Sequence, residues 1–342
     1  MTRRQMIQMA ASAPLVALAG AAPATRLGVD LYSLRSQNWT PIQLLDYCAE
    51  RKAKVVHFSE VRFIGGLEPE NLRQVRAHAE KVGIEVEIGM MSICPTSKMF
   101  QASAGTAEEQ LTRMIGAAVT VGSKIVRCVL GSSADRLPGP IEMHIENAAK
   151  VLRNVRSKAV DSNIKIAIEN HAGDMQGREL KSLIELAGKD FVGACIDSGN
   201  PLWTLEDPHV TLETLAPYAL TSHLRDSAVW RVPEGAAVSW VRMGEGNVDI
   251  EGFVRKYSTL CPGRALSIES IVMGPRTYAF HDPKFWDGYR NVVAWEFERF
   301  LEVADRGKPR PAEPRLSGEA ALRTEREDLD ASLQYAAKLL GV

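Results

Sequence analysis

The feature that most constrains the fold is an alternation of short apolar runs with helix-length amphipathic segments, which continues through most of the 342 residues. Between Ile164 and Trp203, one apolar run ends at Glu169 and a second ends at Asp197, with a segment of helical periodicity between them. Two apolar runs joined by a helix-length crossover are typical of a parallel βαβ unit, in which both strands end at the same rim. We therefore expect Glu169 and Asp197 to lie side by side there.

The same alternation recurs along the chain and sets the number of strands. We predict strands over residues 27–34, 55–58, 84–91, 124–130, 164–168, 192–196, 219–223 and 265–268. About eight strand–helix repeats without a break in composition favour an α/β fold, the closed (β/α)8 TIM barrel, in which every strand ends at one face. An open doubly wound sheet is the alternative, although no GxGxxG motif follows the first strand.

The N-terminus differs from the barrel, which we place at residues 25–306. Residues 1–24 have the features of an export signal peptide, namely the paired Arg3 and Arg4, an Ala-rich apolar stretch and a small-residue cleavage candidate at 22–24. The paired arginines predict twin-arginine export to the periplasm, with the general export route as the alternative. The apolar stretch is too short to span a membrane comfortably, so we expect no stable membrane anchoring.

Residues 307–342 are predicted to form a C-terminal arm. Pro309, Pro311 and Pro314 precede a charged segment of helical character over 318–340. We expect this helical extension to pack on the barrel or on a neighbouring subunit, which favours a homo-oligomer, and a floppy tail is the alternative. The formal net charge of -1 and the lack of a basic stripe argue against nucleic acid as a partner.

Four successive predicted strands end in a potential metal ligand. These residues are Glu169, Asp197, His223 and Glu269. Three carboxylates and one imidazole suit Mn²⁺ or Mg²⁺, and Co²⁺ or Zn²⁺ is possible. Each residue alone has a plainer explanation, because a carboxylate after a strand often caps the next helix and a lone histidine is often structural. Convergence of all four at one barrel mouth predicts a divalent metal site.

These residues lie in motifs that resemble a known superfamily over residues 27–305. The matching pieces are Ile168-Glu169-Asn170-His171, Asp197-Ser198-Gly199-Asn200, His223-Leu224-Arg225-Asp226, Gly244-Glu245-Gly246-Asn247-Val248-Asp249 and Ile268-Glu269-Ser270. In this respect the chain resembles the sugar phosphate isomerase/epimerase superfamily of xylose isomerase-like barrels. The resemblance implies that Glu169, Asp197, His223 and Glu269 bind one divalent metal. It also implies that Glu169 and Glu269 act as acid and base on opposite faces of a sugar, as in ketose 3-epimerases.

Enolisation of a small-molecule sugar is the expected chemistry. A metal that chelates a carbonyl and a neighbouring hydroxyl stabilises the enediolate formed when a carboxylate removes the proton alpha to the carbonyl. The leading hypothesis is a metal-dependent sugar isomerase or epimerase. A lyase that cleaves a 3-keto-sugar or 3-keto-glycoside by beta-elimination is the runner-up. A non-catalytic sugar-binding barrel is the alternative of another class. An endonuclease of the related metal-dependent barrel class is disfavoured, because resemblance to that class implies a trinuclear site with many more histidines than the seven in this sequence.

Further candidate residues surround this set. Asn200 stands where ketose 3-epimerases often carry His, and Arg225 where many family members carry Lys. Arg225 is a candidate to hold a sugar hydroxyl or carboxylate, and Asp226 to orient His223 from outside the metal site, although a structural salt bridge explains them equally well. We also predict substrate contacts for Asn200, His171 and Glu60. His171 is in addition a candidate acid or base, and support of a metal ligand from outside the metal site is the alternative for it. Trp39, Trp203, Trp230 and Trp240 are predicted in or near the loops above the mouth.

Overall fold

The computed structural model describes residues 23–137, 139–311 and 316–342. The predicted export signal at 1–24 falls almost wholly outside these residues and stays a prediction. None of the described helices is long and apolar enough to cross a membrane.

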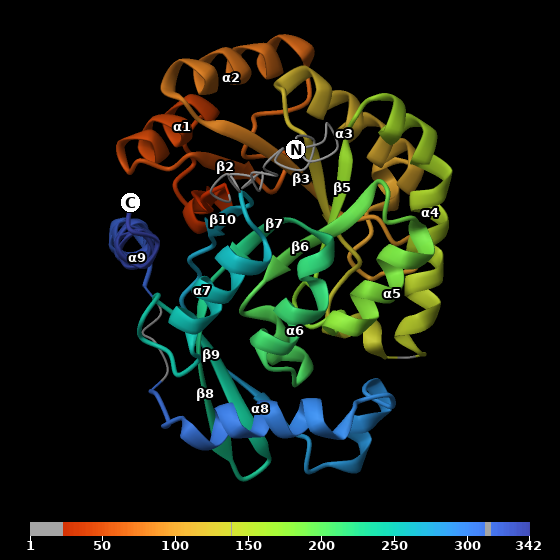
Figure 1. Ribbon diagram of the computed structural model, residues 1–342, viewed down its shortest axis with the longest axis vertical. Coiled ribbons are helices and arrows are strands. Elements are labelled where there is room, and N and C mark those ends of the chain that lie inside the picture. The colour runs from red at the N-terminus through yellow and green to blue at the C-terminus, as the bar shows by residue number, and fades with distance from the viewer. Residues whose placement is uncertain (1–22, 138, 312–315) are drawn as a thin grey trace, which may run out of the picture.

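Eight parallel strands close into a barrel, as the sequence predicts (Figure 1). In barrel order they are β1 (Arg26–Asp30), β10 (Ala265–Ile268), β7 (Ala219–Leu224), β6 (Val192–Asp197), β5 (Lys165–Glu169), β4 (Ile125–Val129), β3 (Glu85–Ser92) and β2 (Val55–Phe58). Seven crossover helices lie outside the strands: α1 (Pro41–Glu50), α2 (Pro69–Val82), α3 (Ala107–Val121), α4 (Ile141–Asp161), α5 (Gly177–Ala187), α6 (Pro208–Leu215) and α7 (Ile250–Leu260). Because all eight strands run the same way, their C-terminal ends share one mouth.

Local signals in the sequence set where these helices begin and end. Thr40 and Thr106 each accept a hydrogen bond from the backbone three residues on, in capping boxes that begin α1 and α3. Gly83 and Gly122 end α2 and α3 in the left-handed conformation, with φ of 72° and 86°, as their positions predict. The apolar faces of the helices and strands join in one continuous hydrophobic core.

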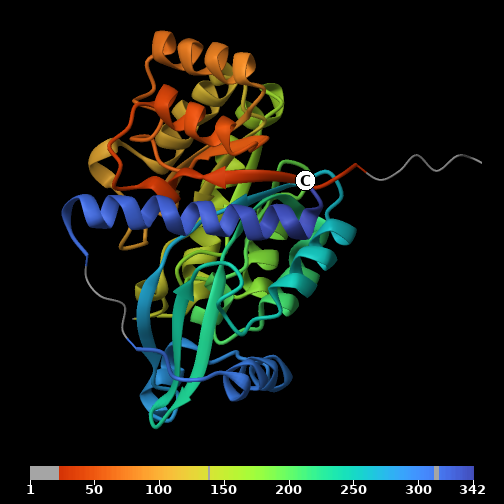
Figure 2. The same ribbon diagram turned by 90° about the vertical axis from the view of Figure 1, so that its left-hand side faces the viewer.

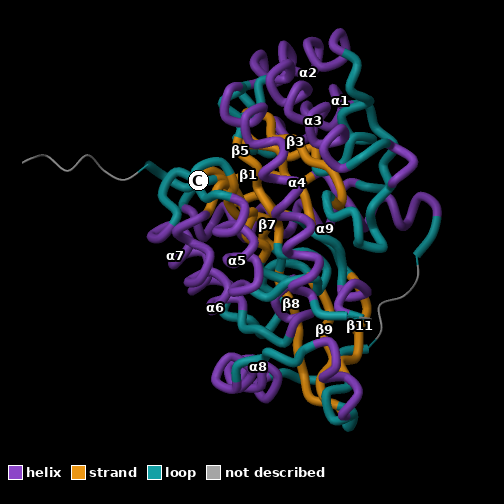
Figure 3. The backbone as a smooth tube through the Cα atoms, turned by 90° about the vertical axis from the view of Figure 1, so that its right-hand side faces the viewer, coloured by secondary structure: helices purple, strands orange, loops and turns teal. Residues whose placement is uncertain are grey.

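A small antiparallel sheet stands beside the barrel, where the sequence analysis expects a loop (Figure 3). It consists of β8 (Asp226–Val232), β9 (Gly235–Val241) and β11 (Met273–Tyr278), and α8 (Ala294–Arg306) packs on it. The expected alternation of polar and apolar residues is weak in β8 and β9, because both strands are buried on nearly all positions. The sheet places Trp240 at the barrel mouth.

The C-terminal arm packs on the barrel, one of the two expected positions. Helix α9 (Gly318–Leu340) contacts α7, β1 and β10 (Figure 2). On its other side, Asp330 accepts hydrogen bonds from Tyr47 of α1 and from Arg51, which follows α1. Helix α9 therefore closes the ring of helices between α7 and α1. The eighth helical position of the barrel is filled by α9, and α8 belongs to the small sheet.

Candidate metal centre

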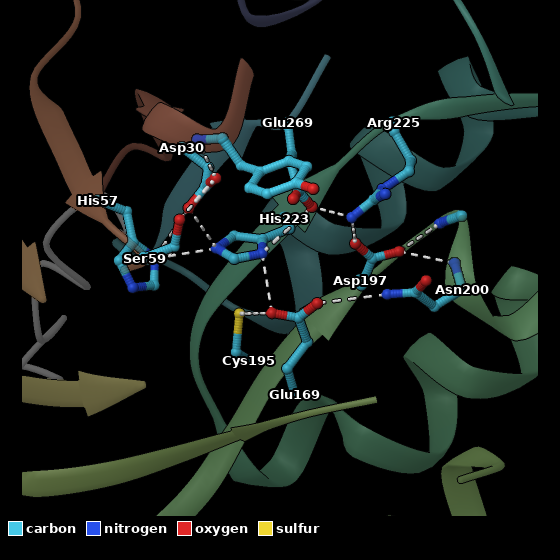
Figure 4. A network of polar contacts seen from close by, with 12 residues as sticks. Asp30, His57, Ser59, Glu169, Cys195, Asp197, Asn200, His223, Arg225 and Glu269 are labelled. Atoms are coloured by element: carbon cyan, nitrogen blue, oxygen red, sulfur yellow. Dashed lines mark hydrogen bonds and ion pairs between the residues drawn. The ribbon is translucent and has the colours of Figure 1, made fainter. Parts of the chain in front are cut away.

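The four predicted ligands meet at the mouth of the barrel (Figure 4). Glu169 and Asp197 are the last residues of β5 and β6, His223 lies one residue before the end of β7, and Glu269 follows β10. One ligand atom from each residue lies within 4.8 Å of those of the others. All four side chains are buried, with Glu269 the most exposed at 6%. The barrel thus converts four strand ends, distant in sequence, into one cluster.

The two nitrogen atoms of the His223 ring face different groups. Its Nδ1 atom lies 2.9 Å from Oε2 of Glu169 and 3.5 Å from Oε2 of Glu269. Its Nε2 atom lies 2.9 Å from Nδ1 of His57 and 3.3 Å from Oδ2 of Asp30. Metal-binding histidines commonly have the second ring nitrogen held by a carboxylate or another polar group, which fixes the tautomer and the ring orientation. Nδ1 is therefore the nitrogen that faces the other ligands.

The residues behind His223 differ from the expectation. Asp226, the candidate to orient His223, instead accepts hydrogen bonds from the backbone of Gly244 and Gly246 at 2.9 and 3.0 Å. It fixes the glycine-rich turn after β9, whereas His57 and Asp30 contact the imidazole. In the sequence, Asp30 and His57 are polar residues at the end of and inside an apolar run. Only the closed barrel brings their side chains, from β1 and β2, to the ring of His223.

Two buried arginines neutralise the carboxylates. Arg127 donates from Nε to Oε2 of Glu169 at 2.6 Å. Arg225 donates from Nη2 to Oδ2 of Asp197 at 2.6 Å, and the same nitrogen contacts Glu269. Burial opposes ionisation of Glu169, but Arg127 and His223 hold the pKa of its carboxyl well below the usual range. Arg127 was missed by the sequence analysis, although it is a lone charge within the apolar run of β4.

The donor atoms fit a divalent cation. His223 Nδ1 and Glu269 Oε2 are buried and lie near charged partners, yet within the described residues neither makes a hydrogen bond of acceptable geometry. Buried polar atoms without such bonds are costly unless another partner satisfies them. Three carboxylates with one imidazole match the preferences of Mn²⁺ and Mg²⁺. Burial raises the pKa of Asp197 to about 6, and Arg225 opposes that rise.

A cavity of about 250 Å³ opens above the cluster. All four predicted substrate contacts line it, namely Glu60, His171, Asn200 and Arg225. Glu269 also lines it, whereas Glu169, Asp197 and His223 are not among its lining residues. The cavity therefore exposes one of the two candidate acid–base glutamates to a bound molecule. The other is held below by Arg127 and by Asn200, whose Nδ2 donates to Oε1 of Glu169 at 3.3 Å.

The ring of His171 presents an acceptor to this cavity. Its Nδ1 atom lies 2.7 Å from the carbonyl oxygen of Gly131. Burial lowers the pKa of the imidazole to about 4, so the ring is neutral at pH 7. A carbonyl oxygen only accepts, so Nδ1 carries the proton and Nε2 is left as an acceptor.

Comparison with known proteins identifies the family. A sequence profile of the xylose isomerase-like TIM barrel family matches residues 45–285. The chain belongs to the xylose isomerase-like TIM barrel family. A relative, 3-oxo-isoapionate decarboxylase of Pectobacterium atrosepticum, is 24% identical over 210 residues, which cover 61% of this chain and 69% of the decarboxylase.

Solved structures of similar fold include sugar enzymes. D-psicose 3-epimerase, solved in the presence of D-fructose, has a TM-score of 0.61 at 14% identity and covers 93% of this chain and 100% of its own. The IolI protein, solved with a bound zinc atom, has a TM-score of 0.54 at 13% identity, with 82% and 96% covered. These identities establish a shared barrel, so the site of this family member has to be argued from its own residues.

Aromatic and cationic side chains form one wall of the site in this xylose isomerase-like barrel. Trp203 and Trp240 stack with ring centroids 4.3 Å apart. The guanidinium of Arg225 lies 4.2 Å from the ring centroid of Trp240, and that of Arg276 lies 4.7 Å from Trp203. Such stacking fixes the plane of Arg225 against the cluster. The two tryptophans come from the loop after β6 and from β9, so the small sheet helps to build the mouth.

Proposed function

We propose that the chain is a divalent-metal-dependent sugar isomerase or epimerase that removes a proton alpha to a carbonyl. The observation that carries this proposal is the position of Glu269, whose carboxylate belongs to the metal-ligand cluster and also lines the cavity above it. A bound metal would supply the positive charge that stabilises an enediolate. A carboxylate beside that charge is correctly placed to take the proton from the neighbouring carbon.

The remaining residues have distinct roles in this proposal. Glu169 acts as a ligand fixed by Arg127, because its carboxylate lies beneath the cavity. Glu269 removes the proton, and returning it to the adjacent carbon gives isomerisation. Return of a proton to the opposite face gives epimerisation and requires a second group that carries a proton. His171 lines the same cavity, but its Nδ1–H donates to the carbonyl oxygen of Gly131, so it is placed to accept a hydrogen bond from a substrate hydroxyl. Asn200 and Arg225 are placed to hold substrate oxygens.

A lyase reaction on a 3-keto-sugar derivative is the second candidate. The observation that favours it is that Glu269, but not Glu169, lines the cavity, because elimination after enolisation needs only one base at the alpha carbon. The decarboxylase relative is consistent with carbon–carbon bond cleavage in this family. A sugar-binding barrel without catalysis is disfavoured, because binding alone does not require a carboxylate aimed at the substrate.

Turnover in deuterated water tests both candidates. Ketoses and 3-keto-glycosides are incubated with the protein and Mn²⁺, and the mixture is followed by NMR. Deuterium is expected at the carbon beside the carbonyl of recovered substrate or product. Glu269 takes the proton from that carbon, the carboxyl proton exchanges with the deuterated water, and a deuteron is returned. A new epimer or isomer identifies the first reaction, and an unsaturated product with a released substituent identifies the second. Turnover without any exchange, at early and late times, would count against enolisation.

A further inference from the structure

A second cavity adjoins the one above the metal ligands. It has a volume of about 330 Å³ and lies over the end of β3, between the loop after β2 and the first half of α3. Glu60, Met91 and Met99 line both cavities. The two spaces are therefore neighbouring compartments of one depression. Figure 1 shows β3 and α3 on the side of the barrel next to α2.

The walls of this second cavity are mainly apolar. They include Val61, Leu67, Met90, Met91, Met99 and Met114. Methionine side chains are flexible and polarisable, so they adapt to varied apolar or aromatic groups and contact rings favourably. Met90 and Met114 are also part of the hydrophobic core, whereas Met91 and Met99 are only partly buried and form the shared boundary of the two cavities.

Several polar groups of the second cavity make hydrogen bonds within the protein. Arg113 donates to the carbonyl oxygen of Ala104, and Gln110 donates to those of Gln101 and Gly105 at 3.0 and 2.8 Å. Arg62 donates to Glu60 at 2.6 Å. These bonds hold the rim in place, and Arg62 and Arg113 each keep further N–H donors. The compartment differs from the cavity above the predicted ligands in its four methionines, of which only Met91 and Met99 also line that cavity.

We propose that the substrate is a sugar with an apolar substituent, such as the aromatic aglycone of a glycoside. The sugar occupies the cavity above Glu269, and the substituent occupies the methionine-lined compartment. The placement of the sugar rests on the proposed function, whereas the placement of the substituent rests on the residues that line the compartment. Small-molecule sites usually measure about 300–1,000 Å³. The first cavity alone is below that range, and the two together lie well within it.

Binding of unreactive glycosides tests the compartment without any turnover. Phenyl and methyl β-D-glucoside lack a ketone, and their dissociation constants for the full chain with Mn²⁺ are measured by calorimetry. The phenyl glycoside is expected to bind at least about tenfold more tightly, which corresponds to about 1.4 kcal/mol and to the burial of a few apolar carbons. Equal affinities, or no binding of the phenyl glycoside, would overturn the proposal.

A matched pair of variants tests whether the apolar substituent binds in the compartment. Ala104 and Ala102 are both exposed in the short 3-10 turn Ala102–Ala104, but only Ala104 lines the compartment. Ala104→Trp should fill the space and reduce the preference for phenyl at least tenfold while leaving binding of methyl glucoside within twofold. Ala102→Trp should change neither. An unchanged preference in Ala104→Trp would refute this location.

The proposed function and the compartment fail in different ways. If the phenyl preference is present and blocked by Ala104→Trp, but 3-keto-glycosides show no deuterium exchange, the compartment stands and the proposed reaction fails. If exchange occurs with no phenyl preference in the glycosides, the reaction stands and the compartment fails.

Discussion

Nη2 of Arg225 lies 2.6 Å from Oδ2 of Asp197 and also contacts Glu269, so one buried guanidinium joins two of the four predicted metal ligands. Arg225 is 3% exposed as a side chain. Because both carboxylates are removed from water, this guanidinium and a bound cation stabilise the same two negative charges. The stability of the protein and its affinity for metal should therefore be linked through Arg225.

Replacing Arg225 by Met should make folding depend on metal. Without the guanidinium, two buried carboxylates lose their cationic partner, and the free energy of unfolding in chelator should fall by about 3–5 kcal/mol. Added Mn²⁺ should restore a large part of that loss, since a ligand that binds only the folded state stabilises it. Urea unfolding with chelator and with Mn²⁺ measures both values. Arg231→Met, which removes an exposed ion pair with Asp305, should cost no more than about 1 kcal/mol in either condition.

Replacing Glu269 by Gln should remove proton transfer. The amide has nearly the same shape but no basic oxygen, so kcat should fall by about 10²–10⁴-fold, and deuterium exchange should fall with it. Circular dichroism should stay as in the wild type. The control is Glu245→Gln, in an exposed turn where Glu245 pairs with Arg310, and it should keep near wild-type activity. Wild-type exchange in Glu269→Gln would remove Glu269 from the mechanism.

Replacing His57 by Leu should weaken metal binding, although His57 lies behind the ligand His223. His57 Nδ1 lies 2.9 Å from His223 Nε2, and loss of such a partner commonly lowers metal affinity by about 10–100-fold. His57→Asn keeps a polar group near the same place and should lose less. Titrations with buffered Mn²⁺ on both folded variants measure the difference. Equal affinities for Leu, Asn and wild type would show that His57 does not orient His223.

Replacing Glu206 by Gln should change how stability depends on pH. Burial raises the pKa of Glu206 to about 7, although Thr211 and the Gly177 backbone donate to it. Between its ordinary pKa of about 4.3 and 7, the folded state binds more protons than the unfolded state, so stability falls as pH rises. Relative to wild type, Glu206→Gln should gain about 1–3 kcal/mol on going from pH 5 to pH 8.

Unfolding curves at several pH values test the Glu206 prediction. The free energy of unfolding of wild type and variant should diverge with rising pH in that window and run parallel outside it. Glu213→Gln provides the control, because the side chain of Glu213 is 58% exposed. A constant difference between Glu206→Gln and wild type across pH 5–8 would contradict the raised pKa.

The barrel and the meeting of four candidate metal ligands at its mouth followed from the sequence because their signals are local. Each strand is a short apolar run, and Glu169, Asp197, His223 and Glu269 each come at or beside a strand end. In a parallel barrel, strand ends share one face whatever their separation in sequence. The helix boundaries at Gly83 and Gly122 were predictable for the same reason, since a C-cap glycine acts within one turn.

Tertiary structure alone decided which residues surround those ligands. The closed barrel pairs β1 with β10 and with β2, which brings Asp30 and His57 to His223 across about half of the chain. Strands β4 and β5 pair in a register that places Val129 opposite Glu169. Arg127 lies two residues before Val129 and so on the same face of β4, from which its side chain reaches Glu169. The strand ends and the side chains that they carry are local features, so both are predictable without the fold. Contacts across the closed barrel, which depend on register and packing and not on local periodicity, decided that Arg225 rather than Asp226 joins the ligand cluster.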